Sequence, residues 1–311
     1  MPTTDTYSTA GSFTWTAPAN VTSVQAECWG GGGGGSRDGG GGGAYSKKTI
    51  SVTPGNNYTV RVAAAGVALT SGGGDSWFST SSTVLAKGGE LGNDGETTNG
   101  LGGAAASGIG DVKYSGGNGA LIDNAGGGGS SAGTAAAGTS TTTGAGAIAP
   151  TGGGDGGSGS VSGTATAGTS PGGGGGGTIL GTAANGAVGK VVLTYTAGSP
   201  APVAAFSGTP TSGTAPLSVA FTDSSTNSPT SWLWEKSSDG GSNWSNFDSG
   251  HTSQNPIESF TAGTWAVRLT ATNAGGSDAE TKTAYITVTA ARRRSLRIVI
   301  SEEKARRLGL I

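Results

Sequence analysis

Hydrophobic and polar residues alternate near the start of the chain, as they do in β-strands with one buried face. Phe13 and Trp15 keep a two-residue period, and a second alternating run ends at Cys28. The residues Pro18-Ala19-Asn20 lie between the two runs and favour a turn. We therefore expect two strands within residues 12–29.

Alternation returns between residues 44 and 62. Ile50 and Val52 come before a group of turn residues that starts at Pro54, and Val60 and Val62 continue the alternation after it. This arrangement predicts a β-hairpin. Much later in the chain, residues 190–196 predict a further strand.

We expect the strand at 190–196 to return and pair with the first sheet. Residues 1–197 then form one glycine-rich β-domain, and residues 64–189 are a low-complexity insertion held at both ends.

Glycine dominates this insertion, since 64 of the 311 residues are glycine. Ordering a backbone costs roughly 1–2 kcal/mol per residue, and glycine has no side chain whose burial offsets that cost. Two outcomes remain, a disordered linker or an array in which backbone N–H and C=O groups pair between segments. We expect a bundle of polyglycine-II-like helices, which have three residues per turn and pack closely only where no Cβ intervenes. Scattered apolar residues favour packing over a linker: Val112, Tyr114, Leu121, Ile122, Ile179 and Leu180.

A second all-β domain is expected at residues 203–290, after a Pro/Gly/Ala linker at 198–202. Asp239-Gly240-Gly241 predicts a hairpin into a strand that starts near Trp244. Short strands at this spacing, without a disulfide, are typical of an immunoglobulin-like β-sandwich. The predicted strands are Val203–Phe206, Leu217–Thr222, Trp232–Glu235, Trp265–Thr272 and Ala284–Thr289.

The final residues, 291–311, form a basic tail. Ser301 to Leu308 has the pattern of a short helix with an N-cap, acidic residues early and basic residues late, and Gly309 ends it. Such a piece is too short to be stable alone, so we expect it to dock on a partner; the alternative is that it closes over the chain's own sandwich. The expected docking residues are Arg292, Arg293, Arg294, Leu296, Ile298 and Ile300.

Motifs along residues 10–197 follow one another in a recognisable order. They are Phe13-Thr14-Trp15-Thr16-Ala17-Pro18, Cys28-Trp29-Gly30 leading into polyglycine, Val52-Thr53-Pro54-Gly55, Gly74-Asp75-Ser76-Trp77-Phe78 and Leu85-Ala86-Lys87-Gly88-Gly89. This order resembles the glycine-rich domain of many phage tail and adhesin proteins. The resemblance implies a virion part, and some members of that family present receptor-binding loops from a polyglycine-II sandwich.

Residues 202–290 also resemble a known module. The run Pro216–Ser225, the strand tryptophan Trp234 and the run Trp265–Ser277 are similar to a PKD domain. The chain departs from that family at residues 235–241, where the family has a compact Asp-Phe-Gly-Asp-Gly turn. The resemblance therefore implies a fold but no ligand site at this turn.

The sequence offers few residues that could form a catalytic site or a metal site. The one histidine, His251, lies in a polar loop, and the one cysteine, Cys28, lies in an apolar run typical of a buried thiol. These two residues cannot supply a zinc site, and the glycine spacings lack the βαβ context of nucleotide binding. We expect no enzyme activity, no metal and no cofactor. The recurring carboxylates are interpreted as turn and capping groups: Asp75, Asp94, Asp111, Asp123, Asp155, Asp223 and Asp239. Calcium binding is the alternative for Asp223 and Asp239.

Charge and hydropathy exclude further classes of function. The net charge of −2 and a charged fraction of 12% leave no broad basic face for nucleic acid. The start of the chain lacks the pattern of a secretory signal, and no stretch is apolar enough to span a bilayer, so no membrane insertion is expected. A phage virion protein, which leaves the cell by lysis, combines surface-type composition with the lack of an export signal.

Aromatic residues in the second domain suggest sugar binding, because indole faces stack on sugar rings. Alternation predicts that Trp234 and Trp265 point into the core. Trp244, beside the predicted hairpin, is the candidate glycan contact.

These observations indicate a non-enzymatic phage minor tail protein or adhesin, located in the virion. Its loops are expected to bind a host-surface glycan, its tail to bind other virion proteins, and several copies to act together on the particle. The alternatives are a capsid or tail decoration protein with no receptor role, and a bacterial surface adhesin.

Overall fold

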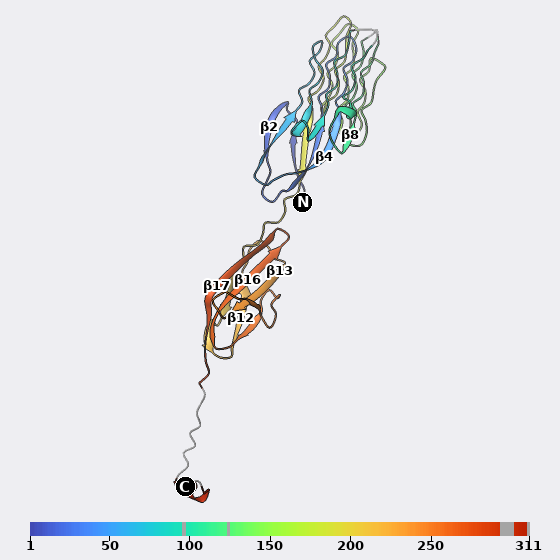
Figure 1. Cartoon of the computed structure of the whole chain (residues 1–311). Helices are drawn as coiled ribbons and strands as arrows, with labels where there is room; N and C mark the ends of the chain where they lie inside the picture. The colour runs from blue at the N-terminus through green and yellow to red at the C-terminus, as the bar shows by residue number, and fades with distance from the viewer. Residues whose placement is uncertain (95–97, 123–124, 293–301, 310–311) are drawn as a thin grey trace. The chain divides into compact units, whose positions relative to one another are not determined.

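The structure is a computed structural model, and it describes residues 1–94, 98–122, 125–292 and 302–309. It consists of two compact units, Met1–Gly198 and Ser199–Ile311, which we call the glycine-rich unit and the second unit. Regular structure in both units is almost entirely β (Figure 1). The predicted all-β fold class is confirmed.

Two antiparallel sheets enclose the core of the glycine-rich unit. Their strand orders are β1-β9-β3-β4-β8 and β2-β5-β6-β7. Inward side chains from both sheets, including Trp15, Phe78 and Leu193, are buried in one cluster, and this burial holds the sheets face to face. The strands are β1 Thr3–Tyr7, β2 Gly11–Thr16, β3 Ser23–Trp29, β4 Tyr45–Ser51, β5 Asn57–Val62, β6 Ser76–Ser79, β7 Val84–Ala86, β8 Val112–Tyr114 and β9 Lys190–Tyr195.

The predicted hairpin at residues 44–62 is wrong. Both strands exist, but β4 pairs with β3 and β8, whereas β5 pairs with β2 and β6. The turn at Pro54 therefore crosses from one sheet to the other. The physical reason is that Ile50 of β4 and Val60 of β5 both belong to the buried cluster, so the two strands face each other across the core instead of lying edge to edge.

The late strand β9 closes the first sheet, as predicted. It pairs with β3 through Gln25 to Trp29 and with β1 through Thr3 to Tyr7. The predicted insertion at residues 64–189 is thus attached at both ends to the same sandwich, but it is also attached within its length, because β6, β7 and β8 belong to the two sheets. A short 3-10 helix, η1 Ala105–Ser107, lies within it.

Backbone hydrogen bonds with a three-residue period order the polyglycine segments. Along Gly39–Ala44, successive N–H groups donate to three different neighbouring segments, and every third residue returns to the same one. This is the pattern of packed polyglycine-II helices, and in Figure 1 the segments run side by side away from the sheets. The donor and acceptor pairs are Gly39 to Ala120, Gly40 to Gly175, Gly41 to Glu90, Gly42 to Gly117, Gly43 to Gly172 and Ala44 to Lys87.

The second unit is a sandwich of two further sheets, ordered β10-β12-β15 and β11-β17-β16-β13-β14. All of their pairings are antiparallel except that of β11 with β17. The core centres on Trp234, which is fully buried among aromatic rings. The strands are β10 Phe206–Thr209, β11 Ser212–Thr214, β12 Leu217–Asp223, β13 Ser231–Ser237, β14 Ser245–Asn246, β15 Ile257–Phe260, β16 Gly263–Asn273 and β17 Gly276–Thr289.

Most of the predicted strands of the second unit occur within β12, β13, β16 and β17, and the hairpin between β13 and β14 is present. The strand predicted at Val203–Phe206 is displaced, because β10 begins at Phe206 and Val203 forms only an isolated bridge with Thr226. At the end of the chain, the predicted helix is observed as α1 Glu302–Arg307. Among the described residues, no helix has the length and apolar character to cross a membrane.

Candidate functional site

Several turns lie at the end of the glycine bundle that is away from the sheets, and we call them the distal turns: residues 36–38, 67–70, 160–163 and 179–181, together with Asn93, Asp94, Leu121 and Ile122. The turn at Ser36–Asp38 joins several of them. The Asp94 Oδ1 atom accepts hydrogen bonds from the Ser36 hydroxyl and from the Arg37 N–H, and the Asp38 Oδ1 atom accepts one from the Ile122 N–H at 3.2 Å. These bonds hold the distal turns in place relative to one another.

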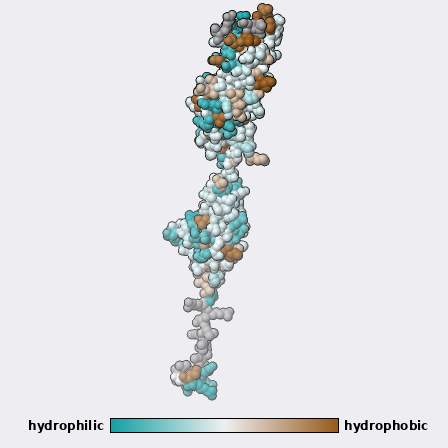
Figure 2. Space-filling view, turned by 90° about the vertical axis from the view of Figure 1, so that its right-hand side faces the viewer, coloured by the Kyte–Doolittle hydropathy of each residue, from teal (hydrophilic) through white to brown (hydrophobic). Residues whose placement is uncertain are grey.

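Aliphatic side chains are exposed on the distal turns. Leu180 is 78% exposed and Leu69 is 64% exposed, and the Leu180 N–H donates to the Val161 carbonyl at 3.0 Å. Figure 2 shows hydrophobic residues gathered at this end of the glycine-rich unit. Leu121 and Leu180 were predicted to pack within the bundle, but both side chains are exposed. Backbone pairing therefore orders these turns and leaves their side chains available for contact.

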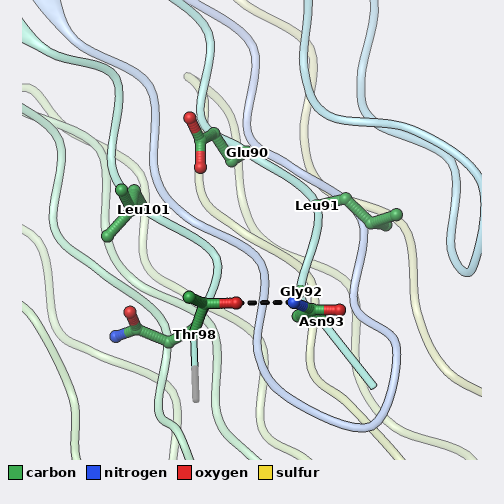
Figure 3. A pocket seen from close by; sticks show the side chains of 7 residues that line it. Glu90, Leu91, Gly92, Asn93, Thr98 and Leu101 are labelled. Atoms are coloured by element: carbon green, nitrogen blue, oxygen red, sulfur yellow. Dashed lines mark hydrogen bonds between the residues drawn. The ribbon is translucent and has the colours of Figure 1, made fainter. Parts of the chain in front are cut away.

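An open hollow of about 600 Å³ lies beside the distal turns, and residues of the segments 90–93 and 98–101 line it. The Asn93 Nδ2 atom donates to the Thr98 hydroxyl at 2.5 Å, and these two side chains point toward one another (Figure 3). Asn99 is tied to the neighbouring segment because its Nδ2 atom donates to the Gly119 carbonyl at 2.7 Å. The lining residues combine one carboxylate, amides, a hydroxyl and two leucines: Glu90, Leu91, Gly92, Asn93, Thr98, Asn99 and Leu101.

Sequence reasoning missed this hollow. Its residues come from segments 90–93 and 98–101, which the hydrogen bond from the Glu90 N–H to the Leu101 carbonyl joins at 2.8 Å, and none of them belongs to a motif. The one feature of the sequence that points to this hollow is the placement of two apolar residues, Leu91 and Leu101, among glycines.

The structure places the predicted glycan contact, Trp244, on the hairpin between β13 and β14. Its side chain is half-buried, and the Arg268 guanidinium carbon lies 4.5 Å from the centre of its ring. Trp234 is fully buried, as expected, whereas Trp265 is only partly buried against the same core. A glycan contact at Trp244 stays a prediction.

The predicted docking tail is described only in part. Arg292 is exposed, whereas Arg293, Arg294, Leu296, Ile298 and Ile300 lie outside the described residues. Docking through this tail stays a prediction.

Several of the carboxylates that were interpreted as turn and capping groups have structural partners. Asp75 forms an ion pair with the Lys87 Nζ atom at 2.6 Å, and Asp155 accepts the Ala149 N–H at 2.6 Å. Burial raises the pKa of Asp223, but hydrogen bonds from Ser225, Gln254 and Trp232 outweigh it, so this pKa lies below its usual value. Asp123 lies outside the described residues.

Hydrogen bonds from residues of its own turn hold the Asp239 side chain in place. Its pKa is lowered by hydrogen bonds from the Asn243 backbone and the Ser237 hydroxyl. Within the described ranges, no group of three or more His, Cys, Asp or Glu side chains is placed to hold a metal ion.

Cys28 lies between the two sheets and is fully buried. Burial, with a smaller contribution from the Glu27 charge, raises the pKa of its thiol. Since the thiolate is the reactive form, we expect a small thiol reagent to leave Cys28 unmodified in the folded protein and to modify it fully in denaturant. Colorimetric thiol titration measures this, and equal rates in the two conditions would contradict the described burial.

Comparison with known protein families gives one match. The model of the family described as "Glycine-rich domain" matches residues 7–196. No curated protein matches the chain. The matched range includes β2 to β9 and the whole polyglycine bundle, which is more than half of the chain. The chain therefore belongs to the glycine-rich domain family.

Proposed function

We propose that this protein is a structural component of a bacteriophage particle, a minor tail protein or adhesin whose distal turns bind a host-surface glycan. The observation that carries the proposal is the hollow lined by residues 90–93, 98, 99 and 101, which lies beside exposed turns on a bundle ordered by backbone hydrogen bonds. A site that is ordered before binding loses little conformational entropy when a ligand arrives.

The chemistry of the hollow supports a sugar as its ligand. A sugar ring presents hydroxyl groups at its edge and C–H groups on its faces. Glu90, Asn93 and Thr98 offer hydrogen-bonding groups, while Leu91 and Leu101 offer apolar contact. The membership of the glycine-rich domain family supports presentation of such a site by a polyglycine scaffold.

The second unit and the tail complete the proposal. We propose that the second unit is a PKD-type spacer, because a buried tryptophan on β13 anchors an immunoglobulin-like sandwich. The basic tail that begins at Arg292 binds other virion proteins, and several copies on one particle multiply weak binding to the cell surface.

A binding assay on bacterial cells tests the distal site. The purified full-length chain is added to candidate host cells, and bound protein is measured directly and by competition with phage adsorption. Leu101→Arg places a long charged side chain in the hollow and is expected to reduce binding at least about tenfold, because the ligand loses both space and apolar contact. Ala135→Arg is the matched control, since Ala135 is exposed and does not line the hollow.

Chemical or enzymatic treatment of the cells shows whether the receptor is a glycan or a protein. Periodate oxidation destroys sugar diols and is expected to abolish binding, whereas protease treatment of the cells is expected to leave it unchanged. Binding that survives periodate but not protease contradicts the glycan proposal. Failure to bind any cell and to compete with adsorption contradicts the receptor role and favours a purely structural decoration of the particle.

A further inference from the structure

A second hollow, of about 270 Å³, lies at the β13–β14 hairpin of the second unit. Two tryptophans, Trp244 from the hairpin and Trp265 from β16, line it together. Both side chains are half-buried, so each retains some exposed surface. Two indoles beside one small hollow are unusual in a chain with an aromatic fraction of 6%.

Neighbouring side chains hold both indoles in position. The Arg268 guanidinium lies over the Trp244 ring, and Arg268 is itself held by an ion pair with Glu235 at 2.7 Å. The Trp265 Nε1 atom donates to the Thr261 carbonyl at 3.0 Å, and its ring meets Phe260 edge to face at 5.6 Å. The two rings are thus fixed before a ligand arrives, which lowers the entropic cost of binding.

Polar groups complete the lining. The Asp239 Oδ1 atom accepts the Asn243 N–H at 2.9 Å, and the Asp239 Oδ2 atom accepts the Asn243 Nδ2 hydrogen at 2.7 Å. Both residues are exposed, and Asp239 also accepts the Ser237 hydroxyl at 2.7 Å and a hydrogen bond from the Ser242 backbone, so its carboxylate is held in one orientation at the rim. The hydroxyls of Ser238 and Ser245 also line the hollow from exposed positions.

The charges around this hollow disfavour an anionic ligand. Among the described residues, Lys236 is the one cation that lines the hollow, and the Lys236 Nζ atom is already paired with Asp248 at 2.5 Å and with Glu258 at 2.6 Å. The nearby Arg268, over the Trp244 ring, is paired with Glu235. Asp239 contributes an exposed negative charge at the rim. An acidic sugar would meet repulsion here without a compensating cation.

We propose that this hollow binds one neutral sugar residue, a hexose or an N-acetylhexosamine, through contact with Trp244 and Trp265 and hydrogen bonds to Asp239 and Asn243. The proposal shares its ligand class with the proposed function, and its residues differ entirely from those of the distal site. It assigns the second unit a binding role of its own.

Free sugars test this assignment on the full-length chain. Saturation-transfer NMR with glucose, galactose and N-acetylglucosamine is expected to detect binding of at least one sugar, with Kd on the order of millimolar, because a single ring buries little surface. The acidic sugar N-acetylneuraminic acid is expected to give no signal. Trp244→Ala is expected to weaken the binding at least about tenfold.

Two arginine substitutions on the same hairpin separate site loss from misfolding. Ser238→Arg obstructs the hollow and is expected to abolish sugar binding at this site, whereas Ser242→Arg, at an exposed position outside the lining, is expected to keep it. Circular dichroism checks the fold of each variant. Absence of any sugar signal from the unaltered chain, or equal binding by the Ser238→Arg and Ser242→Arg variants, overturns the proposal.

Leu101→Arg separates the two sites. It obstructs the distal hollow and so removes any sugar signal from that site, and the signal that remains is expected to come from the second unit, since Leu101 belongs to the glycine-rich unit. If sugar binding is lost in Leu101→Arg and retained in Ser238→Arg, the sugar binds at the distal hollow, and the assignment to the second unit is wrong. Because the readout is a free sugar, failure of the cell assay does not alter this result.

Discussion

Replacing Gly41 with alanine is expected to destabilise the glycine-rich unit by more than about 4 kcal/mol, enough to unfold a domain of ordinary stability. A Cβ at this position would lie 2.0 Å from the Leu101 carbonyl oxygen and 2.3 Å from its carbon. Both atoms belong to the backbone, so no side chain can rotate to relieve the clash. The segment must move, and the hydrogen bond from the Gly41 N–H to the Glu90 carbonyl, 3.0 Å long, is lost with it.

Gly74→Ala is the matched control, because it makes the same chemical change in the same unit. Its Cβ would have its nearest neighbour, the Ala64 nitrogen, at an ordinary contact distance of 3.4 Å. This variant is expected to be neutral or slightly stabilising, by about 0.5 kcal/mol, since alanine restricts the unfolded chain. Denaturant unfolding of both variants, with hydrogen exchange across residues 64–189, measures the difference. Equal denaturant midpoints for the two variants would show that close packing of neighbouring backbones at Gly41 does not stabilise the bundle.

Removing the Trp234 side chain is expected to destabilise the second unit by about 3–5 kcal/mol, the usual cost of deleting a large buried aromatic. Its ring centre lies 5.2 Å from that of Phe206 and 5.3 Å from that of Phe221. Its Nε1 atom also donates to the Ser253 carbonyl at 2.9 Å, and that carbonyl would lose its partner. Trp234→Ala therefore combines a cavity with a broken hydrogen bond.

The two units provide an internal comparison for this variant. Hydrogen exchange should show lost protection within residues 203–289 and unchanged protection in the polyglycine bundle, because each unit has its own core. Trp244→Ala removes the same side chain from the hairpin and is expected to cost only about 1 kcal/mol. A loss of protection in both units with Trp234→Ala would contradict independent cores.

Strand patterns in the sequence predicted the sandwich strands well where one face is buried. The run at Lys190–Tyr195 was placed correctly, and so was its return to the first sheet. The error at residues 44–62 arose because alternation reports which side of a strand is buried and not which strand lies beside it. Strand β15, Ile257–Phe260, escaped prediction because it is short and Ile257 is exposed.

The candidate sites were less predictable than the fold. Trp244 was singled out by its residue type and its place near a turn, whereas its partner Trp265 was assigned wholly to the core. The distal hollow gave no signal beyond the two leucines among glycines, because Asn93 and Thr98 carry no chemistry that distinguishes them from other polar residues in a glycine tract. Their joint position depends on the path of the bundle.

The sequence by itself determined that the chain is all-β and that its glycine tract, where ordered, must be ordered by backbone pairing in place of an apolar interior. Glycine content and strand alternation are properties of the residues themselves, so both conclusions follow without coordinates. Only the tertiary structure decided which polyglycine segments are neighbours and which side chains the distal turns expose. The physical reason is that N–H and C=O groups are the same in every residue, so one glycine run offers the same pairing groups as any other.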